Sequence, residues 1–167
     1  YLDVDPWEFG GEPMTVEAYV KYDSFNQGSR IFDFGDGQAD DNVVLANIGT
    51  TGAAAWRVYI GSSVNALGSA SSTFFEVGTW AHVVATVDGT TMKLYKDGVL
   101  TDTTTDGQEP ASLTRAQHWI GRSAWSSDSY FDGTIAYLRF WHGVALDEDQ
   151  VEQVYAAREN VYVPTLQ

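Results

Sequence analysis

The chain of 167 residues contains no cysteine and few basic side chains. It has 9 lysines and arginines but 23 acidic residues. Without cysteine, neither a disulfide framework nor a thiolate zinc site can form. The formal net charge of −14 repels phosphate backbones, so we expect no nucleic-acid partner. No apolar run approaches the length of a membrane span, and we therefore expect no membrane insertion.

The length suits one domain with a substantial hydrophobic core. We expect residues 1–160 to form that domain and residues 161–167 to be a C-terminal tail or linker. The chain begins with Tyr1 rather than Met, which favours a mature or excised module of a longer protein. Aromatic residues make up 14% of the chain, enough for a core and for several rings on a binding surface.

Short stretches of alternating apolar and polar residues cover most of the chain. They predict roughly ten β-strands, at residues 14–22, 29–34, 43–48, 54–60, 64–67, 80–88, 91–96, 99–104, 117–122 and 136–141. Asp-Gly pairs at residues 88–89 and 97–98 separate three of these runs and predict two successive hairpins. Such a series of short strands predicts an all-β antiparallel sandwich.

The last predicted strand leads into a short helix. Ala136, Leu138 and Phe140 alternate along the strand and are expected to share the face that packs on the core. Asp147 is the expected N-cap of the helix, and Gln150 three residues later completes a capping box. The sequence therefore predicts one short helix near the end of an otherwise all-β chain.

Four motifs follow one another in the second half of the chain. They are Trp80 with His82, Tyr95 with Asp97 and Gly98, Ile120 with Gly121, and Gly133 with Ile135. This succession resembles the laminin G-like and pentraxin-like branch of the concanavalin A-like lectin/glucanase superfamily. The resemblance implies a jelly-roll β-sandwich over residues 1–160. Members of the superfamily include glycosidases, calcium-dependent lectins and plain spacers, so the fold leaves the function open.

Catalysis is not expected from this sequence. Glucanases of the superfamily carry a Glu-x-Asp-x-x-Glu strand that places two carboxylates on one face of a cleft, and the chain has no such strand. The nearest spacing is Asp147, Asp149 and Glu152, at the start of the predicted helix. Capping and the helix dipole explain acidic residues there. The 3 histidines lie far apart, without a serine or cysteine motif around them.

One loop is rich in the hard oxygen ligands that calcium prefers. Its acidic and amide residues are Asp36, Asp40, Asp41 and Asn42. In pentraxins an Asp-Asn pair at this place ligates calcium, and the resemblance adds ligands from the loop before the last strand, where Asp128 and Asp132 lie. We therefore expect one calcium ion (Ca2+) between the two loops. The alternative is that these residues serve ordinary turns and solvation.

The segment before the last strand also has loop aromatics flanked by serines, a pattern typical of sugar-binding surfaces. The candidate ligand-binding residues are Arg122, Trp125, Ser127 and Tyr130. Trp56 and Tyr59 are a second possibility, on opposite faces of one strand. The alternative for each ring is a place in the core. We assign the remaining tryptophans to packing, namely Trp7, Trp80, Trp119 and Trp141.

These expectations combine into a noncatalytic, calcium-binding module for carbohydrate binding or adhesion, within a larger extracellular protein that is secreted or on the cell surface. Its expected partner is a glycan or cell-surface polysaccharide, and the module is expected to be monomeric. The alternative is a protein–protein interaction or structural spacer domain without a small ligand.

Overall fold

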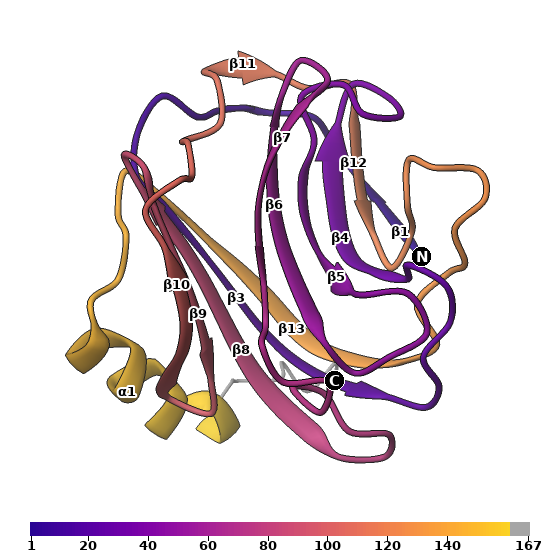
Figure 1. Ribbon diagram of the computed structural model, residues 1–167, viewed down its shortest axis with the longest axis vertical. Helices are drawn as coiled ribbons and strands as arrows, with labels where there is room; N and C mark the ends of the chain where they lie inside the picture. The colour runs from indigo at the N-terminus through magenta and orange to yellow at the C-terminus, as the bar shows by residue number, and fades with distance from the viewer. Residues whose placement is uncertain (161–167) are drawn as a thin grey trace, which may run out of the picture.

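The structure, a computed structural model, describes residues 1–160, and its two main antiparallel sheets lie face to face (Figure 1). The six-stranded sheet has the order β1 (Leu2–Val4), β12 (Gln117–Ile120), β4 (Arg30–Gly35), β5 (Val43–Asn47), β6 (Ala54–Ile60) and β7 (Ser63–Gly68). The five-stranded sheet has the order β10 (Val99–Thr104), β9 (Thr91–Lys96), β8 (Trp80–Asp88), β3 (Met14–Tyr22) and β13 (Gly133–His142). The remaining elements are the ribbon of β2 (Glu8–Phe9) and β11 (Leu113–Thr114), the helix α1 (Glu148–Ala156) and the 3-10 turn η1 (Arg158–Asn160). The predicted all-β jelly-roll sandwich is confirmed, whereas the expected tail at 161–167 lies outside the described residues.

The long predicted strands and both predicted hairpins are present. The turn between β8 and β9 contains Gly89 at φ +56°, and the turn between β9 and β10 contains Asp97 at +51° and Gly98 at +83°. These left-handed conformations are the ones that two-residue hairpins require, which explains the Asp-Gly pairs. The strands that the sequence analysis missed, β1, β2 and β11, are only two or three residues long.

The hydrophobic core fills the space between the two sheets. Val83 and Leu94 of the five-stranded sheet and Phe32 and Trp56 of the six-stranded sheet have no exposed surface. The indole N–H of Trp56 donates a hydrogen bond of 3.1 Å to the carbonyl of Thr86, so one side chain ties the two sheets together. Burying these rings and aliphatic chains supplies most of the driving force for folding.

Strand β13 forms one margin of the five-stranded sheet and contains a bulge. Its register with β3 shifts between Ile135 and Tyr137, which leaves Ala136 as an extra residue. Ile135 and Leu138 therefore pack against the core, whereas Ala136 is exposed. The prediction that Ala136 faces the core was wrong, because the bulge displaces the alternation by one residue.

Helix α1 covers the outer face of the five-stranded sheet, next to β10 (Figure 1). The predicted capping box is confirmed: Asp147 accepts a hydrogen bond from the backbone of Gln150, whose side chain accepts one in return. Val151 is fully buried and packs with Tyr95 of β9. Within the described part of the chain, no helix is long and apolar enough to cross a membrane.

Candidate functional site

The outer face of the six-stranded sheet carries the loop that connects β12 to β13. Residues 122–130 of this connection, which we call the rim loop, stand beyond β12 and β1 in orange in Figure 1. Trp125 of the rim loop packs with Val44 of β5 and with Tyr59 of β6, whose ring centroid lies 5.5 Å from its own. The sheet therefore provides a fixed surface on which the rim loop rests.

A buried arginine anchors the rim loop to the sheet. Arg30 of β4 is 4% exposed, and its Nη2 lies 2.7 Å from Oδ2 of Asp128 in the rim loop. Its Nε lies 3.6 Å from Asp33, and its guanidinium lies 5.2 Å from the ring centre of Trp125. Burial lowers the pKa of Arg30, whereas Asp128 and Asp33 raise it, so the two carboxylates favour the charged form that an arginine keeps in proteins.

Hydrogen bonds to carboxylates hold the rim loop in one shape. The backbone N–H of Ala124 donates to Oδ2 of Asp33 over 2.9 Å, and the hydroxyl of Ser123 donates to Asp128 over 3.0 Å. Burial raises the pKa of Asp33, whereas the bonds from Ala124 and from the Asn42 amide lower it. A loop that is fixed before a ligand arrives loses less conformational entropy on binding.

The rim loop borders a pocket of about 300 Å³, which we call the rim pocket. It is lined by Arg122, Ser123, Ala124, Trp125, Ser126, Asp128 and Tyr130. Three of the four candidate ligand-binding residues, Arg122, Trp125 and Tyr130, are thus brought together. Ser127 is exposed on the same loop and does not line the pocket. A role for these residues in binding stays a prediction.

Planar side chains form a stack beside the rim pocket. The Arg122 guanidinium lies 3.8 Å from the ring centre of Trp119 and 4.9 Å from that of Tyr1. Tyr1 in turn stacks on Tyr130, with ring centroids 5.5 Å apart and an angle of 2° between the planes. Sequence reasoning assigned Trp119 to packing and found no signal for Tyr1, because their contacts join segments that are distant in the chain.

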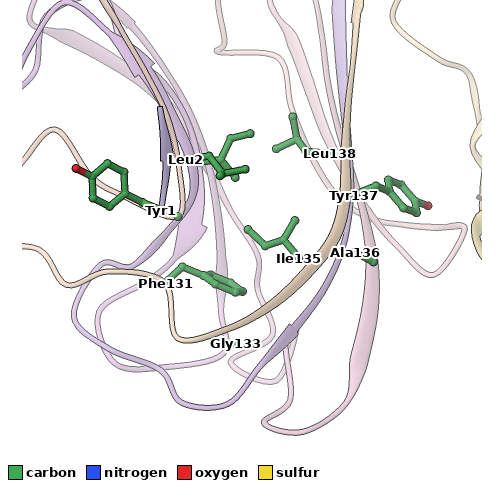
Figure 2. A pocket seen from close by; sticks show the side chains of 10 residues that line it. Tyr1, Leu2, Phe131, Gly133, Ile135, Ala136, Tyr137 and Leu138 are labelled. Atoms are coloured by element: carbon green, nitrogen blue, oxygen red, sulfur yellow. The ribbon is translucent and has the colours of Figure 1, made fainter. Parts of the chain in front are cut away.

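A second hollow, of about 410 Å³, lies between the marginal strands β1 and β13. In Figure 2, Phe131, Ile135 and Leu138 point into this cleft, whereas Tyr137 points to the other side of β13. Tyr1 connects the two hollows, since it lines the cleft and stacks on Tyr130 of the rim pocket. The cleft offers mainly apolar contacts, whereas the rim pocket combines aromatic rings with polar groups.

The acidic loop that was expected to bind calcium follows the end of β4, and a buried arginine lies against it. Nε of Arg115 donates a hydrogen bond of 2.6 Å to the carbonyl of Asp41. Burial lowers the pKa of Arg115, whereas Asp41 and Asp36 raise it. The Asp41 carboxylate accepts the N–H of Gly61 over 2.7 Å, and that of Asp36 accepts the N–H of Ala116.

The other expected calcium ligands also have protein partners. Asn42 is fully buried, with its amide donating to Asp33 over 2.7 Å and its oxygen accepting the N–H of Asp40 over 2.8 Å. Asp132 accepts a hydrogen bond of 2.6 Å from the hydroxyl of Ser24. An ion bound by these oxygens would have to replace existing hydrogen bonds.

The two acidic segments have different arginine neighbours. Residues 36–42 follow the last residue of β4, whereas Asp128 lies against Arg30, the first residue of that strand. Among residues 1–160, no group of three or more His, Cys, Asp or Glu side chains is placed to hold a metal ion. Each segment instead faces an arginine, Arg30 or Arg115, and the six residues do not fit a shared calcium ion.

A buried carboxylate on the outer face of the five-stranded sheet has a structural environment. Glu17 is fully buried and accepts hydrogen bonds from His82 over 2.9 Å and from the Tyr137 hydroxyl over 2.7 Å, with Arg139 at 3.3 Å. Burial acts to raise the pKa of Glu17, but these donors lower it below its usual range. His82 of β8 is fully buried as well, and its hydrogen bond to Glu17 joins neighbouring strands. The partners are donors and cations, not the second carboxylate that glycoside hydrolysis requires.

Comparisons with known proteins agree with this architecture. A sequence model described as "Concanavalin A-like lectin/glucanases superfamily" matches residues 1–152 of the chain. No curated protein sequence matches the chain.

Several solved structures are similar to the fold. A heptameric SAP-like pentraxin from Limulus polyphemus aligns with a TM-score of 0.65 and 18% identity over 89% of this chain and 71% of its own. Domain 4 of AbnA, an extracellular GH43 arabinanase from Geobacillus stearothermophilus in complex with arabinotriose, aligns with a TM-score of 0.68 and 23% identity over 92% and 71%. The CBM40 domain of the Ruminococcus gnavus IT-sialidase, bound to α2,3-sialyllactose, aligns with a TM-score of 0.69 and 15% identity over 92% and 95%. At these identities the likeness shows the fold alone.

Proposed function

Since the chain belongs to the concanavalin A-like lectin/glucanases superfamily, we propose that it is a noncatalytic carbohydrate-binding module whose binding site is the rim pocket. The observation that carries the proposal is the placement of Trp125 and Tyr130 on the lining of one pocket, with Tyr130 58% exposed. The arabinotriose and sialyllactose complexes of structures with the same fold support a sugar as the ligand.

Binding would use aromatic faces and fixed polar groups together. Sugar rings have an apolar face that packs on aromatic side chains, and their hydroxyls require donors and acceptors at set positions. Trp125 and Tyr130 supply the rings, whereas Ser126 and Asp128 supply hydroxyl and carboxylate oxygens. Arg30 holds the rim loop in place, so the site needs little rearrangement on binding.

The proposal includes a noncatalytic role within a larger extracellular protein that binds or adheres to a glycan. Carboxylates near the rim pocket are engaged by partners, since Asp128 pairs with Arg30 and Asp33 accepts two hydrogen bonds. These two carboxylates are therefore not available as the acid and the nucleophile of a glycosidase. The AbnA domain with the same fold belongs to an extracellular enzyme, which supports this setting.

Replacement of Trp125 by alanine tests the proposal. Glycans that bind the parent protein are first identified on a glycan array, and their affinity is then measured by calorimetry. Loss of a central aromatic contact should weaken binding by about 30-fold or more. The control is Trp80→Ala, which removes a partly exposed ring stacked on Tyr19 of the other sheet. Equal losses in both variants, or full affinity in Trp125→Ala, would contradict the assigned site.

Calcium binding at the acidic loops stays a prediction, and the alternative is that Arg30, paired with Asp128, and Arg115, beside Asp41 and Asp36, serve as the cations there. Thermal unfolding with calcium and with a chelator decides it, using Asp41→Ala as the variant. A melting temperature that calcium raises in the parent but not in Asp41→Ala would establish an ion at this loop. An unchanged melting temperature is expected if the arginines serve as the cations.

The second candidate function is a protein–protein interaction or spacer domain. The apolar cleft between β1 and β13, with Phe131, Ile135 and Leu138 pointing into it, favours this alternative (Figure 2). Apolar hollows at a protein surface often mark interaction sites. A glycan array without signal at high protein concentration would favour this candidate over carbohydrate binding.

A further inference from the structure

Three arginines lie on or near the surface around Trp125. Of the six arginines of the chain, Arg30, Arg57 and Arg122 lie on or over the outer face of the six-stranded sheet. Arg57 shares this face with Val44, its cross-strand neighbour, on which Trp125 packs. These arginines lie together in a chain whose formal net charge is −14.

Two of these arginines have no acidic partner. Arg30 pairs with Asp33 and Asp128, but neither Arg57 nor Arg122 forms an ion pair with any of residues 1–160. With 23 acidic side chains in the chain, an intramolecular partner would be easy to supply. Asp128 on the pocket lining pairs with Arg30, so Arg122 on the same lining has no ion-pair partner among the described residues.

The stack fixes how Arg122 can bind a ligand. The rings of Trp119 and Tyr1 lie against the guanidinium, at 3.8 and 4.9 Å. Its N–H donors lie in the plane of the group and point away from such rings. Contact with the rings also removes hydration from the cation, which strengthens its attraction for an anion. A planar, oriented guanidinium of this kind suits a carboxylate or a sulfate, which accepts two parallel hydrogen bonds.

We propose that the rim pocket binds an acidic glycan, with a carboxylate or sulfate group of the sugar on Arg122 and a sugar ring on Trp125 or Tyr130. This inference rests on the proposed function and specifies its ligand class. Arg57 offers a second cation further along the same face. It lies three strand spacings from β12, or about 14 Å, so it would contact a neighbouring unit of a longer acidic chain.

Matched pairs of glycans test the inference by calorimetry at low and high salt. The pairs are sialyllactose with lactose, oligogalacturonate with its methyl ester, and a sulfated polysaccharide with its desulfated form. The first two pairs test a carboxylate and the third tests a sulfate. In at least one pair the acidic member should bind about ten- to a hundredfold more tightly, and salt should reduce this difference.

Variants assign the difference to the stacked arginine. Arg122→Gln should lower the affinity for the acidic glycan to that for its neutral partner, and Arg122→Lys should restore only part of it, since lysine lacks the planar fork. Lys93→Gln removes the same charge from the other sheet and should leave the affinity unchanged. Melting temperatures of all variants check that each one is folded.

The outcomes separate the inference from the proposed function. If neutral and acidic members of every pair bind equally to the parent, or if Arg122→Gln keeps the preference, the acidic ligand is wrong while carbohydrate binding stands. If no glycan binds the parent, the proposed function fails together with the inference. A preference that Arg122→Gln abolishes and Lys93→Gln preserves supports the inference.

Discussion

Replacement of Arg30 by methionine tests whether a buried cation holds the rim loop on the sheet. The methionine keeps much of the aliphatic stem but leaves Asp33, 1% exposed, and Asp128 without their cation. Removing one partner of a buried ion pair costs about 3–5 kcal/mol, because the remaining charge stays buried. We expect a loss of that size at pH 7, measured by urea unfolding followed through tryptophan fluorescence.

The dependence of this loss on pH gives a sharper test. Burial already raises the pKa of Asp33, and without the guanidinium of Arg30 the pKa should rise further. A carboxyl group whose pKa is raised on folding takes up its proton in the native state first. The native state therefore gains stability as the pH falls through the folded-state pKa toward the ordinary value of 3.8. The cost of Arg30→Met should accordingly be smaller near about pH 4.5 than at pH 7.

Two results would refute this reasoning. A loss below about 1 kcal/mol at pH 7 would mean that the pair behaves like an exposed salt bridge and does not anchor the rim loop. A loss that is the same at both pH values would mean that the uncompensated charge of Asp33 is not its cause. The matched control is Lys93→Met, which removes a cation from the half-exposed pair with Glu148 and should cost less than about 1 kcal/mol.

Three further predictions concern the core and the other sheet. Burial, and then Arg115, lowers the pKa of His118 to about 4. The free energy of unfolding of the parent should therefore fall by about 3 kcal/mol between pH 6.5 and pH 4. Urea unfolding of His118→Phe should show a correspondingly smaller dependence on pH. A Cβ at Gly35 would lie 2.2 Å from the buried side-chain amide nitrogen of Asn42. Gly35→Ala should therefore lower the free energy of unfolding by about 1–3 kcal/mol, and a chemical denaturation curve identical to the parent's would contradict that contact. Glu17→Gln should lower the melting temperature at pH 7. The lowered pKa of Glu17 stabilises the fold only while the carboxylate is ionised, so the difference in melting temperature from the parent should shrink as the pH falls below about 4.5.

The sequence predicted the parts of the fold that depend on local pattern. The long strands show their alternation over six to ten residues, and the Asp-Gly pairs at Gly89 and Gly98 mark turns that only a few residue types tolerate. The capping box of Asp147 and Gln150 is likewise contained within four residues. Strands of two or three residues, such as β2 and β11, are too short to show a period.

The bulge in β13 could not be predicted, because an inserted residue leaves no mark in an alternating sequence. Ala136 follows the same apolar pattern as Leu138, and only the pairing with β3 reveals which residue is the extra one. Which residues of the last strand face the core therefore depends on pairing with a strand more than 100 residues away, and local sequence patterns do not contain that information.

The candidate site was predicted in part, for a similar reason. Arg122, Trp125 and Tyr130 occur within nine residues, and the loop that contains them brings all three to one pocket. The cation beside Asp128 comes instead from a distant position, since its partner Arg30 lies 98 residues earlier in the chain. An acidic loop shows that a cation is needed, but its composition does not distinguish a metal ion from an arginine.

The open margin of β13 bears on how molecules of this protein avoid pairing with one another. A marginal strand of ten residues presents a row of backbone donors and acceptors that a second molecule could extend into a shared sheet. The extra residue at Ala136 bends this row, and Arg139 adds a charge along it, so a straight strand from another copy cannot match its whole length. The bulge that made the predicted position of Ala136 wrong thus also discourages edge-to-edge association of β13 strands at high concentration.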